Sequence, residues 1–261
     1  MKYGFIGCGN MGSALANALV KSTNDILICN RITSAQVAEK LGCKAGTAED
    51  VVRNCDRIFI GVKPHMVRDV LAPLKPILAE RNPLLISMAA GLELATLEKY
   101  AGTSLPILRI MPNTPVTLGK GMIGYTPNDL VDAVTLSDFL LDMAYAGMWE
   151  QVEENLMDTV AALSGSGPAY TFYFAEALCS GAVACGMDSG AALRFTIQTL
   201  EGAAAMLKQG DKTPEQLRIE VCSPGGSTLA GLKALDDGNF PPLIAACIKA
   251  AHDRNKELAK M

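Results

Sequence analysis

A glycine-rich stretch near the start of the chain has the spacing of a phosphate-binding turn. Gly7-Cys8-Gly9-Asn10-Met11-Gly12 has the pattern G-x-G-x-x-G and follows a short apolar run, Tyr3 to Ile6. The first glycine permits a tight bend, the second lets a pyrophosphate approach the backbone, and the third lets the next helix pack closely on the strand. A glycine-rich turn without a ligand is the alternative. The strand-turn-helix context favours dinucleotide binding at Ile6, Gly7, Gly9, Asn10 and Met11.

The end of the second predicted strand, Ile26 to Cys29, bears on which dinucleotide is bound. An NAD-specific fold usually has Asp or Glu at this point to accept a hydrogen bond from the ribose 2′-hydroxyl, whereas this chain has Asn30-Arg31. Arg31 can bind a 2′-phosphate through two hydrogen bonds, with the hydroxyl of Thr33 or Ser34 beside it. The sequence therefore predicts NADP, with NADPH preferred and NADH possible. A solvated arginine at a strand end is the alternative.

Three loops follow later predicted strands. Because ligands of such sheets bind at the carboxyl ends of the strands, these loops are expected to line the nicotinamide half of the cofactor site. They contain Val62, Lys63 and Pro64, then Met88, Ala89 and Ala90, and then the segment Met111 to Pro115 with Asn113.

A second glycine-rich segment runs from Cys222 to Leu229, between two stretches with helical spacing of apolar residues. A turn followed by a helix start presents successive backbone N–H groups, which suit a small carboxylate. The Thr228 hydroxyl is then placed to bond to a ring nitrogen next to that carboxylate. The alternative is an interhelical loop in which Ser227 or Thr228 is only an N-cap.

The chain has no obvious acid for the reduction of a ketone or aldehyde. Such a reduction creates an alkoxide that a His or Lys must protonate. The two histidines, His65 and His252, are expected to be structural or solvent-facing. A cyclic imine removes the need for an acid, since it is largely iminium near neutral pH and has only to be held against the nicotinamide.

Short apolar runs alternate with helix-like segments in the first half of the chain, a pattern typical of a parallel sheet covered on both faces. The expected strands are Tyr3 to Ile6, Ile26 to Cys29, Ile58 to Val62, Leu84 to Met88 and Ile107 to Met111, with Gly121 to Thr126 and Gly147 to Glu150 around a helix over 129–145. From Glu153 onward the spacing is helical and β-branched runs are absent. We therefore predict an α/β protein with a dinucleotide-binding domain over 1–152 and an all-helical dimerisation and substrate-binding domain over 153–261.

One further segment, Ala162 to Tyr170, is rich in small residues. It either lets the backbone approach a ligand closely or is a tight kink in a long helix.

Composition narrows the classes of protein and partner. The 261 residues are 49% hydrophobic and 19% charged with a net charge of −4, which favours a globular protein and argues against a nucleic-acid partner. No apolar run is long enough to span a membrane, and the N-terminus does not resemble a signal peptide. Eight cysteines without metal-ligand spacing are interpreted as reduced thiols, so no metal site and a cytoplasmic location are expected. The apolar helices of the second half indicate a homo-oligomer, at least a dimer.

Taken together, the motifs resemble those of the pyrroline-5-carboxylate reductase family over essentially the whole chain. They are Gly4 to Gly12, Val62 to His65, Met88 to Gly91, Met111 to Pro115, Leu163 to Tyr170, and Ser223 to Thr228. The resemblance implies a Rossmann-like domain, a helical dimerisation domain, and reduction of 1-pyrroline-5-carboxylate to L-proline by NADPH. It implies that Ser223, Gly226, Ser227 and Thr228 hold the substrate carboxylate, that the Thr228 hydroxyl contacts the ring nitrogen, and that Glu154 lies near cofactor and substrate. Cys8 and Cys222 are mild departures, because family members often carry alanine and serine there.

The sequence leaves two alternative functions, a second class of dehydrogenase and a non-catalytic sensor. The β-hydroxyacid dehydrogenases are similar in layout but use a lysine shortly after a glycine-rich helix start, where this chain has Pro168, Ala169, Tyr170 and Thr171. A non-catalytic dinucleotide sensor would keep the first motif but would have no need of the turn at 223–228.

Overall fold

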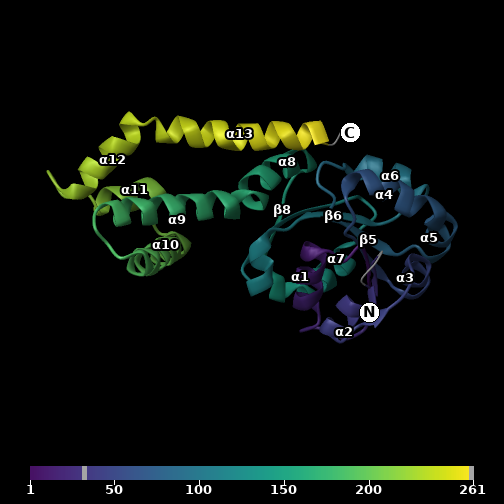
Figure 1. Cartoon of the computed structure of the whole chain (residues 1–261). Helices are drawn as coiled ribbons and strands as arrows, with labels where there is room; N and C mark the ends of the chain where they lie inside the picture. The colour runs from purple at the N-terminus through teal and green to yellow at the C-terminus, as the bar shows by residue number, and fades with distance from the viewer. Residues whose placement is uncertain (31–33, 259–261) are drawn as a thin grey trace. The chain divides into compact units, whose positions relative to one another are not determined.

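The alternating strands and helices build one sheet in the computed structural model, which describes residues 1–30 and 34–258 (Figure 1). Within these residues the strand order is β3-β2-β1-β4-β5-β6-β7-β8, and all neighbours are parallel except β6 and β7. The strands are β1 (Tyr3–Ile6), β2 (Ile26–Cys29), β3 (Lys44–Ala45), β4 (Arg57–Ile60), β5 (Leu84–Ser87), β6 (Ile107–Met111), β7 (Gly121–Pro127) and β8 (Gly147–Gln151). This order is that of a Rossmann-like sheet, as the sequence predicted.

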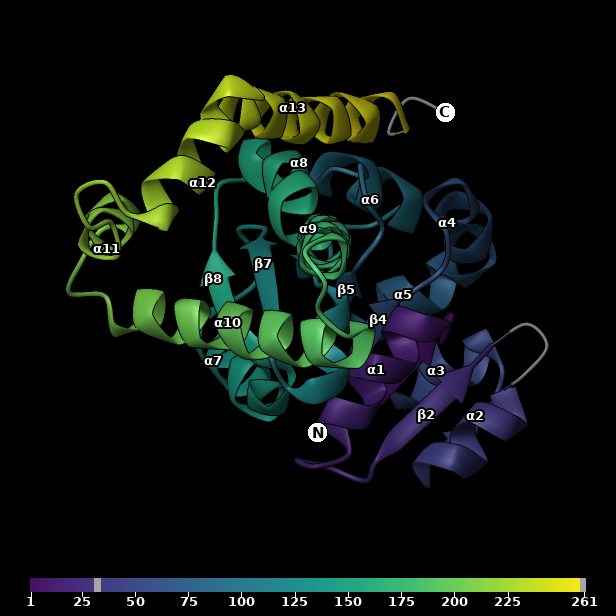
Figure 2. The same cartoon turned by 60° about the vertical axis from the view of Figure 1, so that its left-hand side comes forward.

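Helices cover both faces of the sheet (Figures 1 and 2). One face carries α1 (Asn10–Leu19), α2 (Ser34–Leu41) and α7 (Ala133–Asp142), and the other carries α3 (Ala48–Asn54), α4 (Pro64–Leu71), α5 (Lys75–Arg81) and α6 (Leu94–Ala101). Short 3₁₀ turns join them, namely η1 (Ala72–Leu74), η2 (Thr114–Leu118), η3 (Ala144–Ala146) and η4 (Glu154–Leu156). Because both faces are covered, the central strands are mostly apolar, with Arg57, Ser87 and Arg109 as buried exceptions.

Aromatic side chains form the middle of the core on the α1 side. Phe5 and Phe59 lie on neighbouring strands with parallel rings 4.4 Å apart, and Phe139 of α7 packs against Phe59. On the other face, aliphatic side chains such as Leu71 and Leu78 fill the space between the sheet and α3 to α6. The strands that carry the predicted ligand loops are therefore held rigidly from both sides.

The helices at the end of the chain are α8 (Met157–Val160), α9 (Gly167–Ala184), α10 (Ser189–Gln209), α11 (Pro214–Glu220), α12 (Ser227–Asp237) and α13 (Phe240–Leu258), with a π-helical turn, η5 (Ala161–Gly165), between α8 and α9. The chain forms two compact units. The first comprises Met1–Pro168 and the described residues from Ala250 onward, and the second comprises Ala169–Lys249. The domain boundary between residues 152 and 153 stays a prediction.

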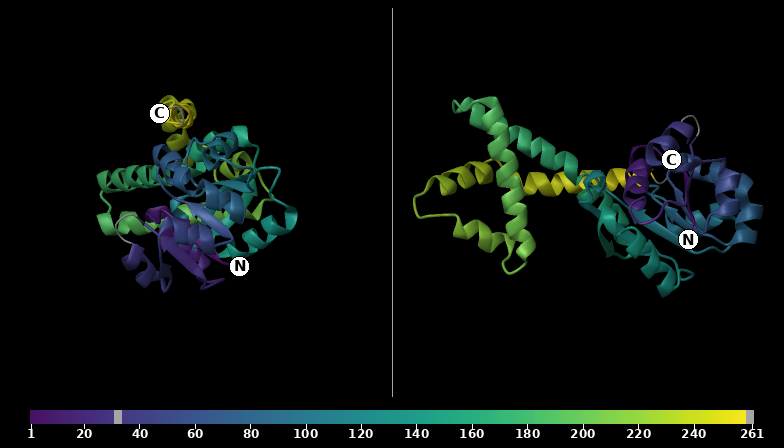
Figure 3. Two further views of the ribbon diagram at one scale, coloured as in Figure 1. Left: turned by 90° about the vertical axis from the view of Figure 1, so that its right-hand side faces the viewer. Right: turned by 90° about the horizontal axis from the view of Figure 1, so that it is seen from below.

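The second unit consists of helices (Figure 3), and few of its side chains are buried. Within residues 169–249, only Ala192 and Thr196 are buried. Large apolar side chains are exposed instead, including Phe172 (68%), Tyr173 (75%) and Phe195 (66%). Surfaces of this kind are typical of protein–protein interfaces. Across the described part of the chain, the helices fall short of the length and hydropathy that crossing a membrane requires.

Candidate active site

A cavity of about 970 Å³ lies in the first unit at the carboxyl ends of the strands. Twelve of the fourteen predicted cofactor-binding residues line it, namely Ile6, Gly7, Gly9, Asn10, Met11, Asn30, Val62, Lys63, Pro64, Met88, Ala89 and Ala90. The other two are Asn113, whose surroundings are given below, and Arg31, which, like Thr33, lies outside the described residues. The structure therefore brings three separate sequence motifs together at one edge of the sheet.

The three glycines of the first turn differ in their surroundings. Gly7 has a φ of +87°, and a Cβ there would lie 2.7 Å from the backbone nitrogen of Val62. A Cβ on Gly12 would lie 3.0 Å from the carbonyl oxygen of Gly7. A Cβ on Gly9 would meet no protein atom within 4 Å, because Gly9 faces the cavity. The second glycine is thus the one that leaves space for a ligand, and the other two are required by the fold.

The N-terminus of α1 opens on the same cavity. Its N-cap is Gly9, which makes no side-chain capping bond, and the first turn contains no acidic residue. Unsatisfied N–H groups and the positive end of the helix dipole therefore face the cavity without a competing carboxylate, which is the arrangement that binds a pyrophosphate.

Two cysteines lie close to this turn. Burial raises the pKa of the Cys8 and Cys29 thiols, and Cys29 lines the cavity. Both are neutral near pH 7 because their ordinary pKa is already above neutrality. They add no negative charge that would repel a phosphate.

The end of β2 carries the predicted 2′-phosphate site. The backbone N–H of Asn30 donates to Ser34 Oγ at 2.5 Å, Ser34 Oγ donates to the Asn30 carbonyl oxygen at 2.6 Å, and Asn30 Nδ2 donates to the Cys8 carbonyl oxygen at 3.3 Å. This network ties the end of β2 to the phosphate-binding turn and to the start of α2.

Sequence reasoning missed one wall of the cavity. Met66, Val70 and Pro73 line it from α4 and η1. Their spacing of four and then three residues is that of one helix face, so the signal was present in the sequence. It was indistinguishable there from an ordinary core-facing stripe.

Two predicted residues of the first unit are fixed by the fold outside the cavity lining. Asn113 is buried, and its amide donates to the Ser164 carbonyl oxygen and accepts from the Met122 N–H, both at 3.0 Å. Glu154 Oε1 accepts a 2.6 Å hydrogen bond from the backbone N–H of Leu94 and lies 3.2 Å from Arg109 Nη1.

The small-residue segment at 162–170 overlaps the π-helical turn η5, where the Ser166 N–H donates to the Ala161 carbonyl oxygen, five residues earlier. Single π turns inside helices occur frequently at functional sites. The Asn113 bond to Ser164 holds this turn next to Met111 and Pro112, which line the cavity.

The turn at 223–228 lies in the second unit. Gly225 has a φ of +71°, and the Gly226 N–H donates to the Ser223 carbonyl oxygen at 2.9 Å. The N-cap of α12 is Gly226, without a side-chain capping bond. Neither Ser227 nor Thr228 is the N-cap, so the capping alternative does not explain these hydroxyls. The start of α12 keeps N–H groups that suit a carboxylate.

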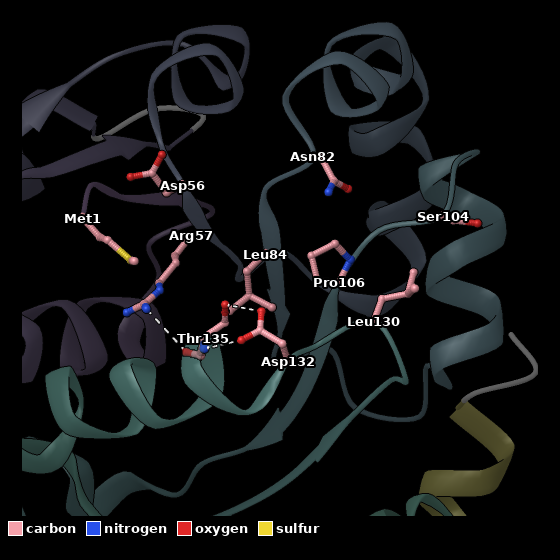
Figure 4. A pocket seen from close by; sticks show the side chains of 10 residues that line it. All are labelled: Met1, Asp56, Arg57, Asn82, Leu84, Ser104, Pro106, Leu130, Asp132 and Thr135. Carbon is pink, nitrogen blue, oxygen red and sulfur yellow. Dashed lines mark hydrogen bonds between the residues drawn. The ribbon is translucent and has the colours of Figure 1, made fainter.

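A second cavity of about 410 Å³ lies at the amino ends of β4 and β5 (Figure 4). Arg57 borders it, and its guanidinium bonds to the Tyr3 hydroxyl, to Asp142 and, as Figure 4 shows, to the Thr135 carbonyl oxygen. The acidic side chains Asp56 and Asp132 also border it. It has neither a glycine-rich turn nor an open helix N-terminus, so it does not suit a dinucleotide. Among the described residues no group of His, Cys, Asp and Glu could hold a metal ion.

Two family models match the chain. The model for pyrroline-5-carboxylate reductase dimerisation matches residues 154–258, and the model for the coenzyme F420-dependent NADP oxidoreductases matches residues 2–91. Among individual proteins, the chain is 36% identical to the pyrroline-5-carboxylate reductase of Glycine max, over 98% of this chain and 95% of the relative. It is 34% identical to that of Escherichia coli, over 99% of this chain and 98% of the relative.

The chain is also similar to solved structures of proteins from this family. The pyrroline carboxylate reductase of Plasmodium falciparum, with NADP bound, has a TM-score of 0.90 and 30% identity, covering 99% of this chain and 98% of that one. The pyrroline-5-carboxylate reductase of Coxiella burnetii also has a TM-score of 0.90, with 35% identity, covering 100% of this chain and 99% of that one.

Proposed function

The chain belongs to the pyrroline-5-carboxylate reductase family, and we propose that it reduces 1-pyrroline-5-carboxylate to L-proline with NADPH. The main support is the turn at Gly9, where the backbone has free space beside it. This turn and three loops at the ends of strands line the same cavity. The alternatives, a β-hydroxyacid dehydrogenase and a non-catalytic sensor, are not favoured by the relatives.

The dinucleotide is proposed to bind in three parts, through the residues of the cavity together with Arg31. Gly7 to Met11 and the start of α1 bind the pyrophosphate, and Asn30 with Arg31 binds the adenosine end and its 2′-phosphate. Val62 to Pro64, Met88 to Ala90 and the neighbourhood of Asn113 hold the nicotinamide end. Support for NADPH over NADH comes from the absence of an acidic residue at Cys29 and Asn30, where a carboxylate would repel the phosphate.

Bound NADPH would supply the hydride that the imine carbon of the substrate ring accepts. The electron pair of the C=N π bond then becomes the lone pair of the ring nitrogen, which already carries its proton in the iminium form. The chain therefore has to orient and hold the ring rather than supply an acid. We assign the substrate carboxylate to the backbone and hydroxyls of Ser223, Gly226 and Ser227, and the ring nitrogen to the hydroxyl of Thr228.

The helical region over 153–261 is proposed to form the dimer interface and to carry the substrate site. Its exposed aromatic side chains and its match to a dimerisation family support this. A cytoplasmic location is also proposed, and the eight cysteines, all free thiols, support it.

The test is an assay of purified protein with 1-pyrroline-5-carboxylate and either NADPH or NADH. We expect NADPH to be consumed and an equal amount of proline to form. Folded protein that turns over neither cofactor would refute the proposed function. The Arg31→Ala variant is expected to raise KM for NADPH selectively, and an equal effect on NADH would contradict the phosphate-binding role.

A further inference from the structure

Arg109 is a buried cation that the reaction scheme does not use. It lies in β6 and is 2% exposed. Its Nη1 is 3.2 Å from Glu154 Oε1, and its Nη2 is 3.7 Å from Asp158 Oδ1. A single guanidinium thus forms a hydrogen bond to one carboxylate, from η4, and a longer ion pair with a second one, from α8. A buried charge in such a place costs desolvation energy, so stability alone explains it poorly.

Glu154 connects this arginine to a third element. Its Oε1 also accepts the 2.6 Å hydrogen bond from Leu94, the first residue of α6. Glu93, the N-cap of α6, makes no side-chain capping bond, so Glu154 caps α6 from 60 positions along the chain. The helix dipole of α6 favours the Glu154 carboxylate at its N-terminus. This stabilisation is lost if the carboxylate moves away from the first turn of the helix.

The loop that enters α6 forms part of the cavity. Ala89 and Ala90 line the nicotinamide end, and the backbone bonds within this loop are long. Leu92 N–H to the Ala89 carbonyl oxygen is 3.4 Å, and Met88 N–H to the Ile60 carbonyl oxygen is 3.3 Å. The short bond from Leu94 to Glu154 is therefore the firm attachment at the exit of the loop.

The same strand brings Arg109 next to the cavity. Arg109 and Met111 are two residues apart in β6, so their side chains point to the same face of the sheet. Met111 lines the cavity and forms an apolar cluster with Met157 and Ala161, against which Ala90 packs. The ion pairs of Arg109 and the apolar contacts of Met111 therefore both involve the segments beside the cavity, namely the loop before α6 and the helix α8.

We propose that Arg109 is a positioning residue for hydride transfer. Through Glu154 it fixes the loop of Ala89 and Ala90, and through Asp158 it fixes α8 and the following π turn, so that the nicotinamide end keeps the geometry that the reaction needs. The proposal rests on the proposed function, because it concerns the same cavity. It assigns Glu154 an action through Leu94 rather than through contact with the substrate.

Arg57 provides a matched control. It is also a buried strand arginine, 1% exposed, with Nη1 2.9 Å from Asp142 and Nη2 3.8 Å from Asp138. In both arginines the Nε is buried without a partner among the described residues. Arg57 lies at the amino end of β4 beside the smaller cavity (Figure 4), whereas the larger cavity lies at the carboxyl ends of the strands.

The experiment compares Arg109→Lys with Arg57→Lys in the full chain. Lysine keeps the charge, but its single ammonium group cannot reproduce the two separate contacts of a guanidinium. We expect both variants to lose thermal stability to a similar extent and to bind NADPH with unchanged affinity. Only Arg109→Lys should lower kcat, by about 10- to 100-fold, since small errors in placement are costly in hydride transfer. Its deuterium isotope effect, with NADPH labelled at the transferred position, should rise as that step becomes slower.

Equal kcat values for the two variants, or an Arg109→Lys variant with weakened NADPH binding and an unchanged isotope effect, would overturn the proposal. If Arg109→Lys does not fold, Glu154→Gln decides, because this side chain is partly exposed. A lower kcat with a raised isotope effect supports positioning. A rise in KM for the imine alone indicates direct substrate contact and overturns the proposal. Wild-type protein without imine reduction would instead refute the proposed function itself.

Discussion

The substitution Gly9→Ala is expected to weaken NADPH binding while leaving the stability of the fold almost unchanged. The new Cβ would meet no protein atom within 4 Å, and Gly9 has φ −75° and ψ −160°, a conformation open to alanine. Replacing a glycine stabilises a chain by about 0.4–1 kcal/mol through the unfolded state. Alanine is a poorer N-cap than glycine, by roughly 0.5–1 kcal/mol. The two effects nearly cancel, so the melting temperature should change by less than about 3 °C.

The expected effect on the affinity for NADPH is much larger than the effect on stability. The methyl group would occupy the space in which the pyrophosphate approaches the start of α1. Loss of two charge-assisted hydrogen bonds, at about 1.5–3 kcal/mol each, raises the dissociation constant by at least about 100-fold.

Fluorescence titration with NADPH and a thermal melt measure the two quantities on the same sample. Gly61→Ala is the contrasting variant, because a Cβ on Gly61 would overlap the carbonyl oxygen of Gly7 and should prevent normal folding. If Gly9→Ala bound NADPH as tightly as the wild type, the pyrophosphate would not lie over this turn, and the placement of the cofactor would be wrong.

Three further outcomes are expected. Thr228→Ala should lower kcat/KM for the imine by about 10- to 150-fold, the value of one hydrogen bond to a charged group at about 1.5–3 kcal/mol, while Thr228→Ser retains most activity. An equal loss of NADPH affinity would contradict a substrate role. Hydrogen bonds from the backbone and hydroxyl of Thr135 lower the pKa of Asp132 below 3.8, so its stabilising effect is present above that pH and is lost as pH falls through the lower, folded-state pKa. The difference in melting temperature between wild type and Asp132→Ala should therefore shrink in strong acid, and a constant difference would refute this. Burial raises the pKa of Cys55 to about 12, so iodoacetamide should alkylate it at pH 8 only as fast as the protein unfolds, as mass spectrometry of the modified peptide can show.

Local patterns were sufficient to predict the sheet and the motifs that line the larger cavity. The apolar runs at β1, β2 and β6 end where the sequence suggested, because a buried parallel strand is recognisable from its own residues. The glycine turn was predictable for the same reason, since its three glycines act within six residues. β3 was not predicted, because Lys44 and Ala45 form a two-residue exposed strand without an apolar pattern.

Contacts between residues far apart in the chain could not be predicted from the sequence. The Arg109 contact to Glu154 spans 45 positions, and the Leu94 contact to Glu154 spans 60. By itself an arginine inside an apolar strand does not reveal which carboxylate will neutralise it. The antiparallel pairing of β6 and β7 was likewise not predicted, because the direction of a strand depends on the path of the chain between the two strands.

The path of the chain through its two units has a consequence for synthesis on the ribosome. The helix α13 returns to the first unit, where Asn255 Nδ2 donates to the Asp158 carbonyl oxygen at 3.3 Å. The helices over 169–249 are therefore translated between two parts of one folding unit, and the sheet emerges long before its last helical neighbour. Nascent chains halted within α12 would carry the complete sheet but would lack this final attachment, so late truncations should weaken the nucleotide-binding half rather than only the helical one.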